Sequence, residues 1–276
     1  MKLREVLADT AIKLSKAGIE GAARDARILT AYALETQISE LSIMTNEKVP
    51  EKIISKLEKL ILRRIDREPV SKILGAREFW GRSFFINENV LDPRGDTETL
   101  IDFVIEKPVT SVLELGTGSG AIAVTLACEW KEVHVTALDI SEDALSLAKI
   151  NAEKFNVQNK IDFLKSDWFE AVKGSFDLII SNPPYIGLIE KDEISTEVIK
   201  YDPEIALFAG HDGLDAYKKI IPNLAKFLNP DGFVVLEIGA SQSNQVKNMM
   251  NVVGLINTQI VKDLSGNDRL VAAKFF

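Results

Sequence analysis

From Ser111 to the C-terminus, short apolar runs alternate with segments of helical periodicity, and this alternation constrains the fold more than any other feature. The runs expected to be strands are 111–115, 133–139, 160–164, 176–181 and 232–239, with helices expected up to 127 and at 142–155, 214–228 and 242–250. Continuous apolar strands separated by helices are typical of a parallel sheet covered on both faces. Two last runs, 258–263 and 269–276, flank SGND and are expected to form an antiparallel hairpin. The pattern therefore predicts an α/β fold whose mostly parallel sheet has one reversed strand.

The beginning of the chain has a different pattern, because its apolar residues recur at helical spacing. Pro50 and Pro69 suit the start and the end of a third helix in this region. The stretch REFWGRSFFINENV then has two aromatic and β-branched runs around Gly81, a pattern typical of a β-hairpin. We therefore expect three parts: a small helical bundle at 1–70, a β-hairpin linker at 71–95 and an α/β domain at 96–276.

The charges are divided unevenly between these parts. Residues 1–85 hold 16 Lys+Arg against 12 Asp+Glu, whereas residues 86–276 hold 17 against 29. The whole chain has a formal net charge of -8, which argues against a broad grip on nucleic acid, since Lys and Arg on phosphate supply most of that affinity. The positive helical part is the candidate for docking a protein substrate. The alternative is a solvated helical surface with a chance excess of basic residues.

Several residues that often carry chemistry are expected to be structural here. The single cysteine, Cys128, excludes an internal disulfide and a cysteine-cluster metal site, and it lies in the apolar run AIAVTLAC. His134 falls in an expected strand and His211 in a loop, so no metal is predicted. The N-terminus mixes charged and apolar residues, unlike a signal peptide or a membrane span. We expect a cytoplasmic monomer without membrane contact.

A glycine-rich loop lies between the first expected strand of the α/β domain and its helix. Glycine lets the backbone turn sharply and approach a ligand, and a helix start offers free N–H groups. Asp139 ends the next strand, where a carboxylate can accept hydrogen bonds from both hydroxyls of a ribose. Together they predict a nucleoside site at the carboxyl edge of the sheet, with Trp168 as a candidate wall for an adenine ring. The loop residues are Gly116, Thr117, Gly118, Ser119 and Gly120.

These residues leave other interpretations open. The sequence GTGSGA also satisfies the dinucleotide fingerprint, so a nicotinamide oxidoreductase remains an alternative. The glycines could mark only a tight turn, with Asp139 capping the helix that begins near Glu142. Taken singly, Asp167 could be a helix cap and Trp168 a core aromatic residue.

The strand at 176–181 ends in the tetrapeptide NPPY, which consists of Asn182, Pro183, Pro184 and Tyr185. Proline cannot donate to a sheet ladder, so two in a row stop the strand and hold the backbone extended. This leaves the amide oxygen of Asn182, the carbonyl of Pro183 and a flat ring beside the expected nucleoside site. Two acceptors on the hydrogens of a planar NH2 group would orient it and favour the pyramidal nitrogen that attacks a methyl electrophile. The motif alone leaves a nucleic-acid base and a side-chain amide both possible as acceptors.

ELGTGSG, Asp139 and NPPY resemble the S-adenosylmethionine-dependent class I methyltransferases. Within them, the chain is similar to the HemK/PrmC family of peptide chain release factor glutamine N5-methyltransferases. The resemblance extends over nearly the whole chain, through PVSKILGAREFWG, VLDPRGDTETLID, YDPEIALFAGHDGLDAYKKI, GFVVLEIGASQSNQV and DLSGNDRLVAA. It implies a Rossmann-like sheet and an enzyme that methylates the glutamine of the Gly-Gly-Gln motif in release factors. The cofactor would be S-adenosylmethionine, which leaves as S-adenosylhomocysteine.

The resemblance also implies residue roles. The loop at 116–120 would line the methionine end of the cofactor, Asp139 the ribose, and Trp168 the adenine side. Asn182, also near the cofactor, and the Pro183 carbonyl would hold the glutamine NH2. The remaining implied residues are Pro184 and Tyr185, which would shape the slot, and Arg94, Thr97 and Glu98, which would lie near the site. The family pattern is close to LIPRPDTE, whereas this chain has LDPRGDTE, so that Asp92 adds charge and Gly95 adds flexibility.

Two further alternatives remain at this point. A DNA amino-methyltransferase uses the same acceptor chemistry on adenine N6 or cytosine N4. It would need a target-reading domain and a basic face, whereas residues 86–276 are acidic and carry no insertion large enough, so no sequence-specific nucleic acid contact is expected. A non-catalytic binding protein with the same fold would not need the glycines, Asp139 and NPPY all intact.

Overall fold

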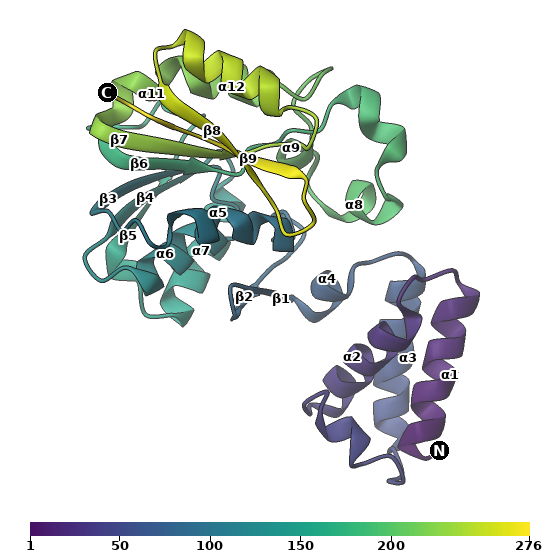
Figure 1. Cartoon of the computed structure of the whole chain (residues 1–276). Helices are drawn as coiled ribbons and strands as arrows, with labels where there is room; N and C mark the ends of the chain where they lie inside the picture. Colours follow the sequence, from purple (N-terminus) through teal and green to yellow (C-terminus); the bar gives the residue numbers. More distant parts are fainter. The chain divides into compact units, whose positions relative to one another are not determined.

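The computed structural model describes residues 1–276 and divides them into two compact units (Figure 1). One unit comprises Met1–Gly75 together with Ser195–Tyr201, and the other comprises Ala76–Ile194 and Asp202–Phe276. The first is helical and the second is built on a sheet; we call them the helical unit and the sheet unit. Helix α4 (Val70–Leu74) continues the helical unit beyond residue 70, and the hairpin belongs to the sheet unit.

The helical unit packs its amphipathic helices around one apolar core. Its helices are α1 (Leu3–Lys16), α2 (Ala22–Leu34), η1 (Glu40–Ser42), α3 (Glu51–Ile65), α4 and α8 (Thr196–Tyr201). Leu14, Leu29 and Leu57 are almost fully buried in this core, one from each of the three long helices. Pro50 is the N-cap residue of α3, as its place in the sequence suggests.

The segment Ser195–Tyr201, which contains α8, is held to the rest of the helical unit by polar contacts at the end of α3. Arg64 donates from Nε to Asp25 Oδ2 at 2.8 Å and from Nη1 to Glu197 Oε1 at 2.9 Å. Asp66 accepts hydrogen bonds from Lys200 Nζ at 2.7 Å and from the Tyr201 hydroxyl at 2.8 Å. Helix α8 therefore belongs to the helical unit, although residues 76–194 separate it in sequence from the other helices of that unit.

The sheet unit contains a seven-stranded sheet in the order β5-β4-β3-β6-β7-β9-β8. Its strands are β3 (Ser111–Leu115), β4 (His134–Asp139), β5 (Ile161–Lys165), β6 (Phe176–Ser181), β7 (Leu228–Glu237), β8 (Ile256–Lys262) and β9 (Asp268–Lys274). Only β9 runs antiparallel to its neighbours, so the prediction of a mostly parallel sheet with one reversed strand is confirmed. The order reverses between β3 and β6, and in such sheets ligands bind at the carboxyl ends beside that point.

Two apolar layers cover the two faces of this sheet. Along β6, Leu178 and Ile180 belong to one buried cluster and Ile179 to the other, as the two-residue period of a strand requires. Helices α5 (Glu98–Val104), α6 (Ala121–Glu129) and α7 (Glu142–Lys154) lie on one side, and α11 (Leu224–Phe227) and α12 (Ser243–Val252) on the other (Figure 1). The continuous apolar strands therefore reflect burial on both faces.

The remaining elements of the sheet unit are short. They are β1 (Ala76–Phe79), β2 (Arg82–Phe85), η2 (Gly95–Thr97), η3 (Gln158–Lys160), η4 (Leu188–Glu193), α9 (Glu204–Leu207), α10 (Asp215–Ile220) and η5 (Ile221–Asn223). Strands β1 and β2 pair antiparallel around Gly81, which confirms the expected hairpin. The single helix expected at 214–228 is wrong, because Pro222 falls inside it and the chain forms α10, η5 and α11 instead.

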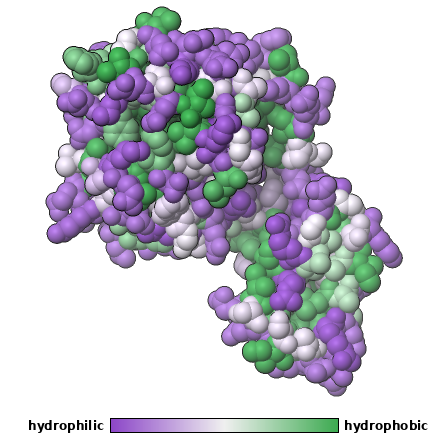
Figure 2. All heavy atoms as spheres, in the orientation of Figure 1, coloured by the Kyte–Doolittle hydropathy of each residue, from purple (hydrophilic) through white to green (hydrophobic).

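Hydrophilic residues cover most of the visible surface of the sheet unit, and the apolar residues there form small separate spots (Figure 2). No helix of the chain combines the length and the apolar character that crossing a bilayer requires.

Candidate active site

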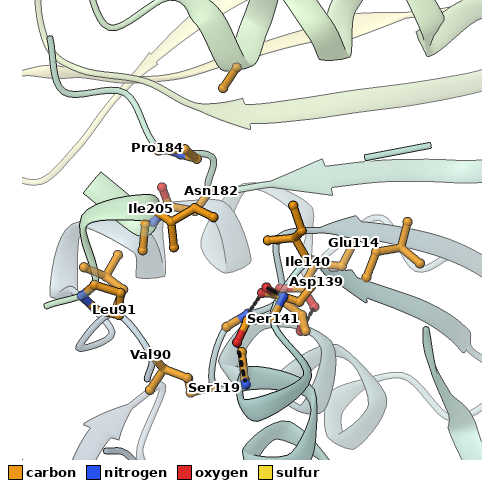
Figure 3. A pocket seen from close by; sticks show the side chains of 18 of the residues that line it. Val90, Leu91, Glu114, Ser119, Asp139, Ile140, Ser141, Asn182, Pro184 and Ile205 are labelled. Carbon is orange, nitrogen blue, oxygen red and sulfur yellow. Dashed lines mark hydrogen bonds between the residues drawn. The ribbon is translucent and has the colours of Figure 1, made fainter. Parts of the chain in front are cut away.

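A pocket of about 390 Å³ lies at the carboxyl ends of β3, β4 and β6, a volume in the usual range for small-molecule sites (Figure 3). Nine of the residues expected at or near the site line it: Thr97, Gly116, Thr117, Gly118, Ser119, Asp139, Trp168, Asn182 and Pro184. Gly120, Pro183 and Tyr185 are not among its lining residues. The structure thus brings the glycine loop, the acid after β4 and the end of β6 to one cavity.

The three glycines of the loop are needed for different reasons, although all have positive φ. At Gly116 and Gly118, an added Cβ would meet no atom within 4 Å. At Gly120, an added Cβ would lie 3.0 Å from the Cβ of Ala148 in α7. Gly116 and Gly118 therefore leave the backbone open to a ligand, whereas Gly120 allows α6 and α7 to pack closely.

Asp139 braces the glycine loop with both of its carboxylate oxygens. Oδ2 accepts a hydrogen bond from the backbone N–H of Gly118 at 2.9 Å, and Oδ1 accepts one from the N–H of Ser141 at 2.9 Å (Figure 3). Burial raises the pKa of Asp139, while these backbone N–H groups oppose that rise. Each oxygen keeps capacity for a second hydrogen bond, so the carboxylate can accept the two hydroxyls of a ribose.

Trp168 has φ 50, a left-handed conformation that is uncommon for a bulky residue. The hydroxyl of Ser166 donates to the Trp168 carbonyl at 2.8 Å and accepts from the N–H of Ala171 at 3.0 Å. This conformation is therefore fixed by local hydrogen bonds, and Trp168 lines the pocket at the end of β5 together with Asp167. Backbone strain of this kind often accompanies ligand sites.

Glu114, in β3, was not expected from the sequence to line the pocket. It is fully buried, and its Oε2 accepts hydrogen bonds from the Thr117 hydroxyl at 2.7 Å and the Ala123 N–H at 3.0 Å. Burial raises the pKa of Glu114 to about 8. An acid inside the apolar run SVLEL was the visible sequence signal, since a buried acid is rare without a role.

The amide of Asn182 is held in one orientation. Its Nδ2 donates a hydrogen bond to Oγ1 of Thr97 at 3.0 Å, so Oδ1 is the group left to accept hydrogen bonds from a ligand. Thr97, Asn182 and Pro184 all line the pocket. In Figure 3, Asn182 and Pro184 lie across the cavity from Asp139 and Ser141.

Tyr185 is fixed behind this wall. Its hydroxyl donates to Glu237 Oε1 across a long 3.4 Å, and its carbonyl accepts from Gln242 Nε2 at 2.8 Å. The ring packs with the apolar cluster between the sheet and α10 to α12. Burial raises the pKa of its hydroxyl far above the ordinary value, so Tyr185 stays protonated.

The block LDPRGDTE is anchored to the segment that precedes α9. Arg94 Nη2 lies 2.6 Å from Asp202 Oδ2, and the same carboxylate accepts the N–H of Asp92 through Oδ1 at 3.2 Å. Asp92 itself is buried, with its Oδ1 3.5 Å from Arg77 Nε. The negative charge that Asp92 adds to this chain therefore lies beside the basic side chain of Arg77.

Other residues that line the pocket were not singled out from the sequence. They include Leu91, Pro93, Pro203, Ile205 and Phe208.

Of the two other residues expected near the site, Arg94 and Glu98, neither lines the pocket. Glu98 accepts a hydrogen bond from the N–H of Trp80 through Oε1 at 2.8 Å and so fastens the hairpin to α5.

Cys128 and His134 lie outside the pocket. Cys128 is half-buried, and burial raises the pKa of its thiol. His134 is exposed, and its Nε2 lies 2.8 Å from Asp162 Oδ2. No three side chains of the types His, Cys, Asp and Glu are grouped so as to hold a metal ion.

Two family models match the chain, the Methyltransferase small domain over residues 88–205 and the PrmC N-terminal domain over residues 5–75. A release factor glutamine methyltransferase of Cereibacter sphaeroides is 40% identical over 274 residues, which cover 99% of both chains. A bifunctional methyltransferase of Rickettsia prowazekii is 40% identical over 292 residues; the match covers 98% of this chain but only 56% of that longer protein.

A crystal structure of a methyltransferase from Pyrococcus furiosus is similar to this chain, with a TM-score of 0.53 and 22% sequence identity. The match covers 80% of this chain and 98% of the Pyrococcus furiosus chain. This likeness supports the class I methyltransferase fold of the sheet unit. The near-complete match to the Cereibacter sphaeroides protein adds the helical part, which the family model for the PrmC N-terminal domain also covers. The chain therefore belongs to the family of release factor glutamine methyltransferases.

Proposed function

We propose that this protein transfers a methyl group from S-adenosylmethionine to the side-chain amide nitrogen N5 of the glutamine in the Gly-Gly-Gln motif of peptide chain release factors. The observation that carries the proposal is the amide of Asn182, which is held through its Nδ2 by Thr97 and belongs to a residue that lines the same pocket as the glycine loop and Asp139. The names of the relatives that match nearly the whole chain support the same substrate class.

The pocket suits the cofactor in size and in the kind of groups it presents. Asp139 can accept the two ribose hydroxyls, Trp168 can flank the adenine, and the open backbone at Gly116 and Gly118 can approach the methionine part. The buried acid Glu114 adds a polar group on the same wall. When bound, S-adenosylmethionine supplies the methyl group on a sulfonium, a strong electrophile.

The residues of NPPY act on the other reactant. An amide nitrogen is a poor nucleophile because its lone pair is delocalised into the carbonyl. Oδ1 of Asn182 and the carbonyl of Pro183 would each accept one hydrogen of the glutamine NH2, which orients it and favours the pyramidal nitrogen. Pro184 and Tyr185 would shape the slot around this group. Each preorganised hydrogen bond of this kind is worth roughly 3 kcal/mol in a transition state.

The proposed partner is a folded protein, and the helical unit is the part proposed to dock it, because it has the excess of basic residues. We further propose that the enzyme works in the cytoplasm, because its proposed substrates act in translation. The acidic sheet unit argues against sequence-specific nucleic acid binding.

The test is incubation of the protein with a purified release factor and isotope-labelled S-adenosylmethionine, followed by peptide mass spectrometry. We expect one labelled methyl group on the glutamine of the Gly-Gly-Gln peptide. A release factor whose motif glutamine is changed to alanine is the matched control and should stay unlabelled. A parallel arm with duplex DNA separates the alternative, and label in DNA but not in the release factor would overturn the proposal.

A further inference from the structure

We propose that Asp202 is a positioning residue, which holds an apolar wall of the pocket in place for the peptide that carries the acceptor glutamine. The inference rests on the proposed function, because the occupant of the wall is a segment of the release factor. It deepens that function by assigning one part of the pocket to the acceptor. Asp202 does not itself line the pocket and would act through its neighbours.

Asp202 joins two segments of the sheet unit that are far apart in the sequence. Its side chain is buried, with only 1% of its surface exposed. Oδ1 accepts a hydrogen bond from the N–H of Asp92 at 3.2 Å, and Oδ2 accepts one from Nη2 of Arg94 at 2.6 Å. One carboxylate thus ties residues 92–94 to the beginning of 202–208, through hydrogen bonds that its charge strengthens.

Both segments contribute apolar side chains to the pocket. Leu91 and Pro93 flank the Asp92 N–H that Asp202 binds, and Pro203 follows Asp202 directly. A displacement of this carboxylate would therefore move both segments. We call their pocket-lining apolar residues the apolar wall, which consists of Leu91, Pro93, Pro203, Ile205 and Phe208.

The half of the apolar wall around α9 is held at both of its ends. Helix α9 is a single turn of four residues, which is too short to be stable alone. At its C-terminal end, the N–H of Ile186 donates to the Leu207 carbonyl at 3.0 Å, and the N–H of Ala209 donates to the Ile186 carbonyl at 2.9 Å. Ile186 directly follows NPPY, so this end is aligned with the motif. Asp202 fixes the other end.

The apolar wall lies on the acceptor side of the cavity. In Figure 3, Leu91 and Ile205 lie away from Asp139, on the side of Asn182 and Pro184. The wall presents no charged side chain, so it suits the methylene groups of a glutamine and an uncharged stretch of peptide beside it. Ile205 is 61% exposed, which leaves its side chain accessible to a large partner.

The first test needs no release factor. Isoleucine δ1-methyl NMR spectra report on the wall through the signal of Ile205, which is identified by its loss in Ile205→Val. Asp202→Asn keeps the shape of the side chain but removes the charge that binds Arg94, so the Ile205 signal should shift or broaden. Glu129→Gln is the matched control, because it removes a carboxylate that binds Arg82 at the same 2.6 Å outside the pocket. It should leave the Ile205 signal unchanged.

An unchanged Ile205 signal in Asp202→Asn would overturn the inference. If Asp202→Asn does not fold, Arg94→Met breaks the same ion pair from its more exposed side, and the same shift is expected.

The second test is the kinetics of methylation of a purified release factor. We expect Asp202→Asn and Ile205→Ala each to raise KM for the release factor about fivefold or more, with kcat nearly unchanged, because both weaken binding of the acceptor. The Kd for S-adenosylmethionine should change by less than about twofold. In the double variant, the rise in KM should be smaller than the product of the single effects, because both substitutions act on one wall. Glu129→Gln should leave KM unchanged.

A wild-type KM in Asp202→Asn, even with a lowered Tm, would mean that the ion pair serves stability alone and would overturn the inference. A weaker affinity for S-adenosylmethionine at unchanged KM would assign the wall to the cofactor and would overturn it as well. If the wild-type protein does not methylate the release factor, the proposed function fails, whereas the NMR spectra still decide whether Asp202 holds the wall. The two failures are therefore distinguishable.

Discussion

The guanidinium of Arg64 joins α3 to α8 across 133 positions of the chain, with Nη1 2.9 Å from Glu197 Oε1. The same side chain pairs with Asp25 of α2 at 2.8 Å. Because α8 is connected at both ends to the sheet unit, the chain passes between the two units three times, after Gly75, after Ile194 and after Tyr201. The proposed docking unit thus contains a segment that is covalently continuous with the chain following NPPY.

Arg64→Met should destabilise the helical unit by about 3 to 5 kcal/mol, because it leaves the carboxylate of Asp25 buried without this cation. Glu197→Gln is the matched comparison. It removes only the contact to α8, whose acidic side chain is 30% exposed, and should cost about 0.2 to 1 kcal/mol. Hydrogen exchange of the α2 and α3 amides measures both. Equal losses in the two variants would contradict the assigned roles.

Docking of the protein substrate on the helical unit can be tested by charge reversal at its exposed lysines. Deletion of residues 1–70 would leave cofactor binding and abolish transfer under our proposal, but it also removes the partners of α8. A triple variant with Lys16→Glu, Lys52→Glu and Lys59→Glu keeps those partners. We expect KM for the release factor to rise roughly tenfold while kcat stays nearly unchanged. The rise in KM should be smaller at high salt, because salt screens the interaction between the two charged surfaces.

Lys131→Glu is the control for this prediction, because Lys131 is a 92% exposed lysine of the sheet unit. It should leave KM unchanged at every salt concentration. An unaltered KM in the triple variant would mean that the positive charge of the helical unit is only a solvated surface.

Gly118→Ala and Gly120→Ala form a matched pair that separates ligand approach from packing. Both place a side chain at positive φ, which costs about 1 to 2 kcal/mol. Gly120→Ala adds a clash with Ala148, about 1 to 3 kcal/mol more, so it should lower Tm further. Gly118→Ala should weaken S-adenosylmethionine binding more strongly, because its methyl group enters open space at the pocket. Calorimetric titration and thermal melts distinguish the two, and the reverse ranking would be inconsistent with the geometry.

Much of the sheet could be predicted, because strands buried on both faces are continuously apolar and are separated by helices. The same logic places the residues after β3, β4 and β6 at one edge, so Asn182 and Asp139 were expected at a common site. Local sequence patterns were sufficient to predict a structure wherever it depends on residues that are close in the sequence.

Long-range polar contacts could not be predicted in this way. Nothing near Glu197 in the sequence indicates that it pairs with Arg64, and the partners of Asn182 and Tyr185 lie in η2 and β7. Likewise, the spacing of the glycines does not indicate that Gly120 faces Ala148 of α7 rather than the pocket. These assignments depend on which elements meet in three dimensions. Pro222, in contrast, was a readable signal that the helix expected at 214–228 is interrupted.

Gly95→Pro should stabilise the protein by about 0.4 to 1 kcal/mol, because proline restricts the unfolded chain at a position whose native conformation it can adopt. Gly95 is the first residue of η2, a place that suits proline, and an added Cβ meets no atom within 4 Å. Arg94 before it is extended, with ψ 147, as a residue before proline must be. Thermal melts give the change, and Gly95→Ala is the control for side-chain size. A loss of stability in Gly95→Pro alone would show that the loop needs the freedom of glycine.

Glu114 should make the stability of the fold fall as pH rises from about 4.5 to about 8. Its pKa is raised by burial from 4.5 to about 8 in the folded state. Within this window the unfolded chain has released the proton while the folded chain keeps it, so the folded state binds more protons and rising pH favours unfolding.

Glu114→Gln cannot titrate, and its oxygen can still accept from Thr117 and Ala123. The Tm of Glu114→Gln minus that of the wild-type protein should therefore increase between pH 5 and pH 8, by an amount that corresponds to at least about 1 kcal/mol of unfolding free energy. Glu237 titrates in both proteins and cancels in the difference. Glu142→Gln is the control, because Glu142 is exposed and its partner Lys165 lowers its pKa, so its own difference should stay flat over this range. A pH-independent difference for Glu114→Gln would mean that the buried carboxyl ionises normally.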